Sequence, residues 1–233
     1  MSDRAILKIG HRGACGYEPE NTLRSFRKAI ELGVDMIEFD VHKCLTGELV
    51  IIHDETVDRT TNGQGEVMKK TLKELKELDA GQGERIPTLK EALALIDKKT
   101  QVNVELKGIG TAKSVADLIR KLIQDKRWKK EDFLVSSFDH PELREFFKND
   151  SDIPIAILFE DNFFPYLPLA EELKATAINI PLYIASQKYI QQAHQAGLKV
   201  NVWTVNTARD IRRLYDYGVD GIISNYPDRL NIL

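Results

Sequence analysis

The stretch VDMIEFDV, residues 34 to 41, places two carboxylates among apolar side chains with a period of two. Residues two apart on a β-strand share a face, so Glu38 and Asp40 lie together on one side. Val34 and Met36 extend that side, and every residue of the opposite side from Ile37 onward is apolar. We expect the apolar side to pack against the surrounding helices. The carboxylates then lie on the opposite, inner face of the sheet, near the carboxyl end of the strand.

Short apolar runs like this one recur along the chain, with amphipathic helical segments between them. The predicted strands are residues 5–10, 34–41, 101–107, 132–138, 153–159, 176–180, 198–205 and 219–224. Eight strand–helix units in about 250 residues are typical of a (β/α)8 TIM barrel, an α/β fold. A doubly wound sheet is the alternative, but the G-x-G-x-x-G loop that usually follows its first strand does not occur in the sequence.

One segment, from about residue 42 to 85, does not fit a simple repeat. It is too long for a βα loop of ~2–6 residues. It contains a spare strand at residues 49–52 and a short helical pattern, TLKELKELD, at residues 71–79. We interpret it as a small insertion after strand 2, on the catalytic face of a single catalytic domain that spans residues 1–233.

Composition excludes several classes of protein. A chain of 233 residues, 42% of them hydrophobic, is long enough to bury a barrel-sized core. The net charge of -3 gives no reason to expect a nucleic-acid partner. No apolar run approaches the ~20 residues of a membrane span, and the N-terminus lacks a secretory signal pattern. We expect a cytoplasmic protein that binds a small molecule, without stable membrane insertion and in an undetermined oligomeric state.

Cys15 and Cys44 are expected to be free thiols, although a disulfide is geometrically conceivable.

A third carboxylate comes from QVNVELK, residues 101 to 107, where Glu105 falls on the polar face. Three carboxylates that converge repel one another strongly. Each could be paired with a cation such as Lys107, or all three could bind a divalent metal ion. Oxygen ligands favour Mg²⁺, Ca²⁺ or Mn²⁺ over zinc. His42 continues the face of Glu38 and Asp40, and we interpret it as a polar residue at the edge of the insertion rather than as a ligand.

Two histidines follow strands on the same side of the predicted barrel. His11 and Arg12 open the loop HRGACGYEPENT, residues 11 to 22, and His53 follows the spare strand. A single histidine is more often structural than catalytic, but here both lie at strand ends near carboxylates. Imidazoles exchange protons near neutral pH, and an arginine can bind a phosphate through its planar fork. The combination indicates metal-assisted phosphoryl chemistry.

An ordered set of motifs resembles the glycerophosphodiester phosphodiesterase family. They are HRG at 11–13, PENT at 19–22, E-x-D at 38–40, HD at 53–54 and E-L-K at 105–107. The stretches VNVWTVN, 200–206, and GVDGIISNYPD, 218–228, are similar to the last two strands of that family. Single short motifs are weak, but this set covers the chain from residue 11 to 228 in order. One departure is Thr46-Gly47, where the family usually has Asp-Gly, and we expect it to change only a local cap.

This resemblance implies a TIM barrel that hydrolyses glycerophosphodiesters to sn-glycerol 3-phosphate and an alcohol, with one divalent cation, Mg²⁺ or Ca²⁺, Mn²⁺ being a third option. The roles it implies are metal ligands Glu38, Asp40 and Glu105, an acid–base pair His11 and His53, phosphate-binding Arg12 and Lys107, and Trp203 on the glycerol side. The leaving alcohol, the cation and the nucleophile, water or the glycerol 2-hydroxyl, remain open.

Two alternative functions are compatible with the same residues. One is a lysophospholipase D-like hydrolysis of lipids that retain an acyl chain. For that activity, the aromatic segment DNFFPYLPL, residues 161 to 169, could form an apolar rim of the pocket, but we favour the interpretation that it packs on the next helix as a local cluster. The other is a non-catalytic barrel that binds phosphodiesters. Retention of both histidines argues against the second alternative, because binding alone needs no proton-transfer pair.

Overall fold

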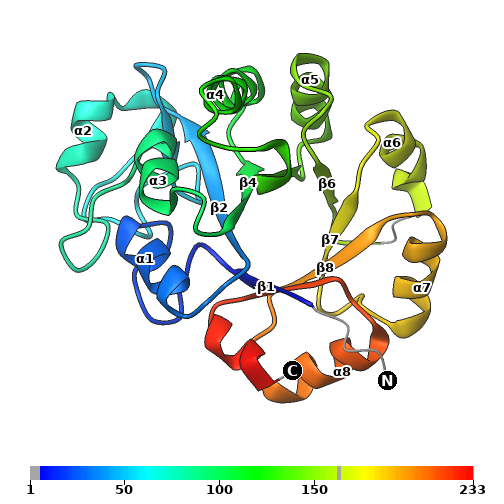
Figure 1. Ribbon diagram of the computed structural model, residues 1–233. Helices are drawn as coiled ribbons and strands as arrows, with labels where there is room; N and C mark the ends of the chain where they lie inside the picture. The colour runs from blue at the N-terminus through cyan, green and yellow to red at the C-terminus, as the bar shows by residue number, and fades with distance from the viewer. Residues whose placement is uncertain (1–5, 162–163, 233) are drawn as a thin grey trace.

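The computed structural model describes residues 6–161 and 164–232, and its centre is a closed parallel barrel (Figure 1). Its eight strands are β1 Leu7–Gly10, β2 Met36–Lys43, β4 Gln101–Leu106, β5 Phe133–Ser137, β6 Ile155–Leu158, β7 Ala177–Pro181, β8 Lys199–Trp203 and β9 Gly221–Ser224. Neighbouring strands pair in this order, and β1 closes the ring by pairing with both β2 and β9. The predicted (β/α)8 fold is confirmed.

Helices cover the outside of the barrel (Figure 1). They are α1 Leu23–Glu31, α3 Leu89–Ile96, α4 Ala112–Gln124, α5 His140–Asn149, α6 Leu167–Glu172, α7 Gln187–Gln195 and α8 Ala208–Tyr217, with short 3-10 turns η2 Lys130–Asp132, η3 Phe164–Tyr166 and η4 Pro227–Ile232. Side-chain caps fix several helix starts. The Thr22 hydroxyl accepts from the backbone N–H of Ser25, and Thr88 and Glu91 form a capping box at α3. These caps orient the helices whose apolar faces meet the strands.

The two faces of β2 bury different side chains. Ile37 and Phe39 belong to the large apolar core between barrel and helices, and a fully buried side chain of this size contributes about 1.5–3 kcal/mol. Met36 points the other way, into a smaller cluster inside the barrel that closes its base. Val34 was expected on that inner side but packs in the outer core, because it precedes the first paired residue of β2 and does not follow the alternation of the strand.

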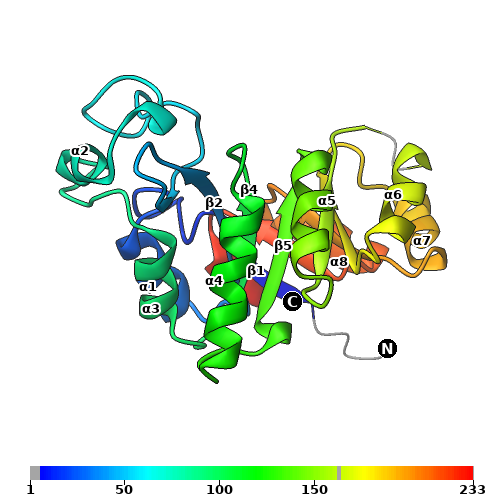
Figure 2. The same cartoon turned by 90° about the horizontal axis from the view of Figure 1, so that it is seen from above.

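Residues 42–85 form a compact excursion beside β2 and α1 (Figure 2). It contains β3 Leu49–Ile51, which pairs antiparallel with the end of β2, then η1 Val67–Lys69 and α2 Leu72–Glu77. The Thr46 hydroxyl accepts from the N–H of Leu72, the first residue of α2, whose N-cap is Thr71. A separate apolar cluster holds the excursion together: Cys44, Val50, Ile52, Val57, Val67, Leu75, Ala80 and Ile86.

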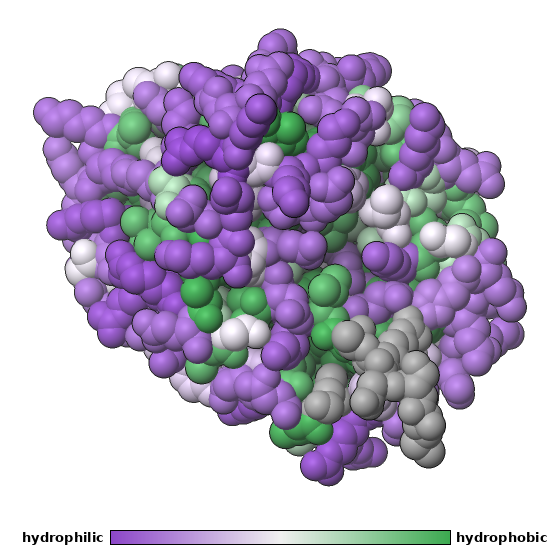
Figure 3. All heavy atoms as spheres, in the orientation of Figure 1, coloured by the Kyte–Doolittle hydropathy of each residue, from purple (hydrophilic) through white to green (hydrophobic). Residues whose placement is uncertain are grey.

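Most of the visible surface is hydrophilic, with small scattered apolar groups (Figure 3). Among the described residues, none of the helices has both the length and the apolar character needed to cross a membrane. Cys15 and Cys44 are both free thiols. Cys44 belongs to the apolar cluster of the excursion, whereas Cys15 lies beside His11.

Candidate active site

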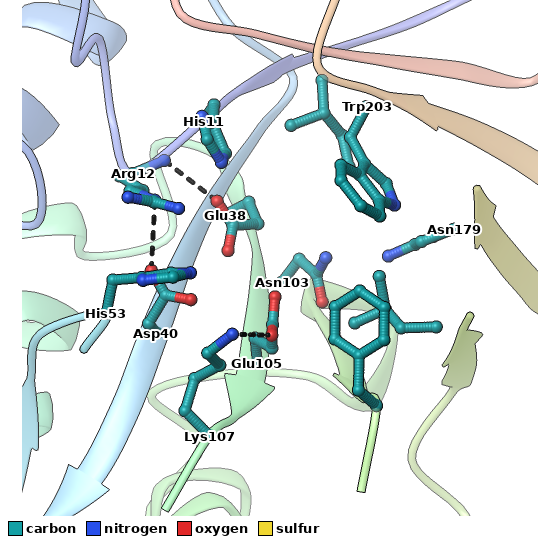
Figure 4. Close-up of a pocket in the computed structure, with 13 residues that line it drawn as sticks. His11, Arg12, Glu38, Asp40, His53, Asn103, Glu105, Lys107, Asn179 and Trp203 are labelled. Atoms are coloured by element: carbon teal, nitrogen blue, oxygen red, sulfur yellow. Dashed lines mark hydrogen bonds and ion pairs between the residues drawn. The ribbon is translucent and has the colours of Figure 1, made fainter. Parts of the chain in front are cut away.

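Three carboxylates converge where β2 and β4 end. The parallel register places Asp40 opposite Glu105, and Glu38 precedes Asp40 by one inward position. All three side chains are buried, and one carboxylate oxygen from each lies within 4.8 Å of the others. Strand alternation therefore explains the cluster completely, since each residue occupies an inward position near a carboxyl end (Figure 4).

Charge at this cluster is only partly compensated by the protein. Burial raises the pKa of Glu105 to about 7, with a further contribution from the Asp40 charge, and the same two causes raise the pKa of Glu38. Lys107 Nζ lies 3.2 Å from Glu105 Oε1, as an ion pair without hydrogen-bond geometry, so this buried oxygen has no hydrogen-bond donor within the described chain. Asn21 Nδ2 donates to Asp40 at 2.8 Å. The cluster is suited to an added positive charge.

His11 projects from the end of β1 into the same pocket. Its Nδ1 lies 2.6 Å from Asn225 Oδ1, which follows β9 at the other end of the barrel sequence. An amide oxygen only accepts, so Nδ1 carries the proton and Nε2 of the neutral ring keeps its lone pair. Burial lowers the pKa of His11 to about 4, and the neighbouring Arg12 charge acts in the same direction. At neutral pH this imidazole is an available base.

His53 is held differently, by a carboxylate. Its Nδ1 lies 2.6 Å from Asp54 Oδ1, and Arg59 bridges Asp54 and Glu20 through hydrogen bonds of 2.7–3.0 Å. Those bonds from Arg59 hold the pKa of Asp54 well below its usual range, so the carboxylate remains ionised. An ionised carboxylate on Nδ1 stabilises positive charge on an imidazole ring. The two histidines therefore have chemically opposite supports.

Arg12 lies between the two histidines, surrounded by acidic groups. Its backbone N–H donates to Glu38 at 2.9 Å, Nη1 donates to Glu20 at 2.7 Å, and Nε lies 3.4 Å from Asp40. The guanidinium is thus fixed on the pocket wall by two carboxylates, Glu20 from the loop before α1 and Asp40 from β2, while Glu38 holds the backbone. Gly13 follows at φ +86, and an added Cβ there would lie 2.3 Å from the Ser25 hydroxyl. The loop therefore packs directly on α1.

The pocket that contains these groups has an empty volume of about 400 Å³. All eight predicted site residues line it: His11, Arg12, Glu38, Asp40, His53, Glu105, Lys107 and Trp203. Figure 4 shows the carboxylates between Arg12 and His53 on one side and Trp203 and Asn179 on the other. The structure brings the whole predicted set together, and the role of each member stays a prediction.

Sequence reasoning missed five residues that line the same pocket: Asn103, Phe138, Leu158, Asn179 and Ile223. Asn179 and Trp203 each present a buried N–H donor without a hydrogen-bond partner in the described part of the chain. The Asn179 oxygen accepts from Asn201 at 2.9 Å, which leaves its amide N–H groups free to face the pocket. Strand alternation could have indicated Asn179, since it lies two residues after Ala177, a residue of the inner cluster of the barrel. An amide in an apolar strand, however, carries no chemical signal by itself.

His42 and the segment 161–169, whose roles the sequence left open, both make local structural contacts. His42 is absent from the carboxylate cluster, and its Nε2 lies 3.1 Å from the backbone oxygen of His53, at the edge of the insertion. In the 161–169 segment, Tyr166 stacks on Phe159 with ring centroids 4.8 Å apart. Phe164 is 46% exposed and does not line the pocket, and Phe163 lies outside the described residues. Local packing therefore accounts for Tyr166.

Comparisons with known proteins agree over nearly the whole chain. Residues 11–229 match the model of the glycerophosphoryl diester phosphodiesterase family. A glycerophosphodiester phosphodiesterase of Caldanaerobacter subterraneus subsp. tengcongensis is 39% identical over 233 residues, covering 96% of both chains. A lysophospholipase D of Homo sapiens is 26% identical and covers 95% of this chain and 84% of that protein. The structure of an Oleispira antarctica phosphodiesterase in complex with the product sn-glycerol-3-phosphate matches with a TM-score of 0.89 and 31% identity, covering 96% of this chain and 94% of that one.

Proposed function

The chain belongs to the glycerophosphoryl diester phosphodiesterase family and is a glycerophosphodiester phosphodiesterase, and from this premise we propose that it uses a divalent cation and two histidines to release sn-glycerol 3-phosphate and an alcohol. One observation carries the proposal. Two histidines with opposite supports on Nδ1 share a pocket of about 400 Å³ with three buried carboxylates, an arginine and a lysine. We include in the proposal that residues 1–233 form one catalytic domain and that residues 42–85 are an insertion in it.

Glu38, Asp40 and Glu105 would hold the cation. Their oxygens lie within 4.8 Å of one another, and Glu105 Oε1 is buried without a hydrogen-bond donor from the described residues. This donor set contains only oxygen, so it suits Mg²⁺, Ca²⁺ or Mn²⁺. A bound cation would supply the positive charge that offsets three carboxylates and the substrate phosphate together.

Arg12 and Lys107 would bind the phosphate from opposite sides of the cluster. Both line the pocket, and each is already held by the carboxylates, Arg12 by Asp40 and Glu20 and Lys107 by Glu105. Side chains that are fixed in this way bind an anion with little loss of conformational freedom. The planar Arg12 fork also offers two parallel N–H donors to phosphate oxygens.

The proton transfers follow from the supports of the two histidines. His11 Nε2 takes the proton of the attacking group, which is either water or the 2-hydroxyl of the glycerol. Attack by water gives sn-glycerol 3-phosphate directly, whereas attack by the 2-hydroxyl gives a cyclic phosphate that water then opens to the same product. As the bond between phosphorus and the leaving oxygen breaks, His53 Nε2 donates a proton to that oxygen, and the Asp54 carboxylate at Nδ1 orients the ring for this transfer. The roles are assigned in this direction because His11 rests on a neutral amide beside a cation, whereas His53 rests on an anion.

The glycerol portion would lie against the wall formed by Phe138 and Trp203, whose rings meet edge to face with centroids 5.8 Å apart. The buried donors Asn179 Nδ2 and Trp203 Nε1 are on this side, and a glycerol hydroxyl would satisfy them. Leaving such donors unpaired in the complex is costly, so this wall favours a polyol over a simple alkyl group.

A second candidate is the hydrolysis of lysophospholipids. Phe138 is 37% exposed at this wall, and the chain resembles a lysophospholipase D of Homo sapiens. An acyl chain on the glycerol could pass over that ring to solvent.

The test is an assay of the purified protein on glycerophosphocholine, glycerophosphoethanolamine and lysophosphatidylcholine, with glycerol 3-phosphate and choline measured separately. We expect glycerol 3-phosphate from the first two substrates, loss of activity with a chelator, and recovery with Mg²⁺, Mn²⁺ or Ca²⁺. Choline release from the third substrate would establish the lipid activity. Full activity of protein shown to be metal-free by elemental analysis would contradict the metal requirement.

A further inference from the structure

A second cleft opens beside the catalytic pocket, with an empty volume of about 540 Å³. Three segments form its walls: the end of β2, the insertion, and the loop that follows β4. The lining residues are His42, Lys43, Glu55, Glu66, Met68, Lys107, Gly108 and Ile109. Met68 and Ile109 are 64% and 86% exposed, so two large apolar side chains stand at its edge.

The cleft adjoins the catalytic pocket. Lys107 lines both, and Glu55 lies two residues beyond His53. His42 connects the two walls, because its Nε2 contacts the backbone oxygen of His53 and its Nδ1 faces the backbone of Gly108. Figure 4 shows His53 and Lys107 on the side of the pocket away from Trp203 and Asn179. With the glycerol against Trp203 and Asn179, as in the proposed function, the leaving group would lie on the side of His53 and Lys107, toward this cleft.

The charged residues that line the cleft differ in whether they have an ion-pair partner. Lys107 is paired with Glu105, and Lys69 Nζ lies 2.7 Å from the carboxylate of Glu66. The stem of Lys43 runs toward the turn at Gly47, with Cε 4.0 Å from the place where a Cβ there would stand. Glu55 is exposed, and within the described ranges it takes part in no ion pair. Among the described residues, Glu55 and Lys43 are thus the charged lining residues without an ion-pair partner, and the Lys43 stem is directed to the turn at Gly47.

We propose that this cleft is the subsite for the leaving alcohol and that Glu55 makes it select alcohols that carry a cationic amine, such as choline or ethanolamine. The inference rests on the proposed function, because it assumes that His53 protonates the leaving oxygen on this side. A carboxylate provides the counter-ion for the ammonium group, and the apolar side chains of Met68 and Ile109 contact its methyl or methylene groups. Glu55 is not among the residues assigned to the cation, the phosphate or the proton transfers, so its charge can be removed without replacing any of those groups.

The experiment compares kcat/KM for glycerophosphocholine with kcat/KM for glycerophosphoglycerol, whose leaving alcohol is uncharged. Glu55→Gln is expected to lower the ratio of the two values about fivefold, and Glu55→Lys to lower it further, with glycerophosphoglycerol turnover unchanged. The matched control is Glu77→Gln, which removes the same charge from the exposed surface of α2 and lines neither the pocket nor the cleft. Salt at 0.5 M should reduce the difference between wild type and Glu55→Gln, since screening weakens an exposed ion contact.

Two results would overturn the subsite alone. One is an unchanged ratio in Glu55→Gln and Glu55→Lys, and the other is an equal change in Glu77→Gln, which would indicate a general effect of net charge. If wild-type protein hydrolyses neither substrate with any divalent cation, the proposed function is wrong and the subsite is rejected with it. Turnover of both substrates with no dependence on residue 55 leaves the proposed function intact and removes only the inference.

Discussion

At the scale of single residues, the two histidines have the same ring but different partners at Nδ1. His11 donates to an amide and His53 to a carboxylate that Arg59 keeps ionised. We propose on this basis that His11 accepts a proton and His53 donates one. The two roles can be distinguished with a substrate whose leaving group needs no proton. Neither Asn225 nor Arg59 belongs to the motifs that identify the histidines in the sequence.

We predict that His11→Ala and His53→Ala each lower the turnover of glycerophosphocholine by ~10²–10⁴-fold. They should differ on the p-nitrophenyl ester of glycerol 3-phosphate, because its leaving group departs without a proton. His53→Ala should recover most of its activity on this ester, whereas His11→Ala should not. His194→Ala serves as the control, since this imidazole lies outside the pocket. Equal recovery in both variants would show that the roles are assigned wrongly.

A second prediction concerns the titration of His11. Its pKa is about 4 in the folded protein against 6.5 in an unfolded chain. A lowered pKa contributes stability that is present above pH 6.5 and is lost as the pH falls through about 4. The difference corresponds to about 3 kcal/mol in the free energy of unfolding.

Urea unfolding of metal-free wild type and His11→Gln at pH 7 and pH 4 measures this contribution. The wild type should lose about 3 kcal/mol more than the variant between the two pH values. Imidazole NMR signals of His11 should show a midpoint near pH 4. A midpoint near 6.5 would contradict the lowered pKa of His11.

At the scale of elements, the loop between β1 and α1 depends on a close approach that only glycine permits. Gly13→Ala is expected to destabilise the protein by about 2–4 kcal/mol, from backbone strain at positive φ and from the clash with Ser25. Gly33→Ala provides a matched control, because Gly33 also has positive φ, +73, but no atom within 4 Å of the added Cβ. Urea unfolding should show a loss of about 1 kcal/mol there. Equal losses would mean that the contact with α1 is unimportant.

The elements were also what the sequence predicted best, and the reason is periodicity. In β2 and β4 the alternation of apolar and polar residues correctly predicted that Glu38, Asp40 and Glu105 lie on the inner face of the barrel. Side chains alternate between the two faces of a strand, and burial of one face determines which residues point to it. Val34 shows the limit, since alternation holds only where the strand is paired. Asn21 shows another limit, because its amide donates to Asp40 and an asparagine just before a helix gives no sign of such a contact.

Contacts between distant segments were beyond sequence reasoning. His11 meets Asn225 across 214 positions, and Arg59 meets Glu20 across 39. Such pairs depend on how the barrel closes and on where the insertion folds back, and no local pattern records either. Phe138 and Asn179 were missed for a different reason, because their strand positions could be read but their residue types indicate no chemistry.

At the scale of the whole molecule, the carboxylate cluster should couple cation binding to stability. At a concentration of 100 times Kd, Mg²⁺ or Ca²⁺ should raise the free energy of unfolding by about 2.7 kcal/mol, since the unfolded chain has no such cluster. Glu105→Gln should abolish most of this increase while it leaves the metal-free protein folded. Calorimetry with and without the cation measures the effect. An identical increase in the Glu105→Gln variant would place the cation elsewhere.

The contact between His11 and Asn225 also determines when the site is completed during synthesis. β1 is translated before the other strands of the barrel, yet it pairs with β9, and the Nδ1 partner of His11 lies just beyond that strand. Until β9 is translated, the edge of β1 that pairs with it and the His11 imidazole both lack their native neighbours. The nascent barrel therefore carries the His11 imidazole in an unoriented form and an unpaired strand edge until β9 and Asn225 have been translated, so orientation of this imidazole and barrel closure arise in the same late step.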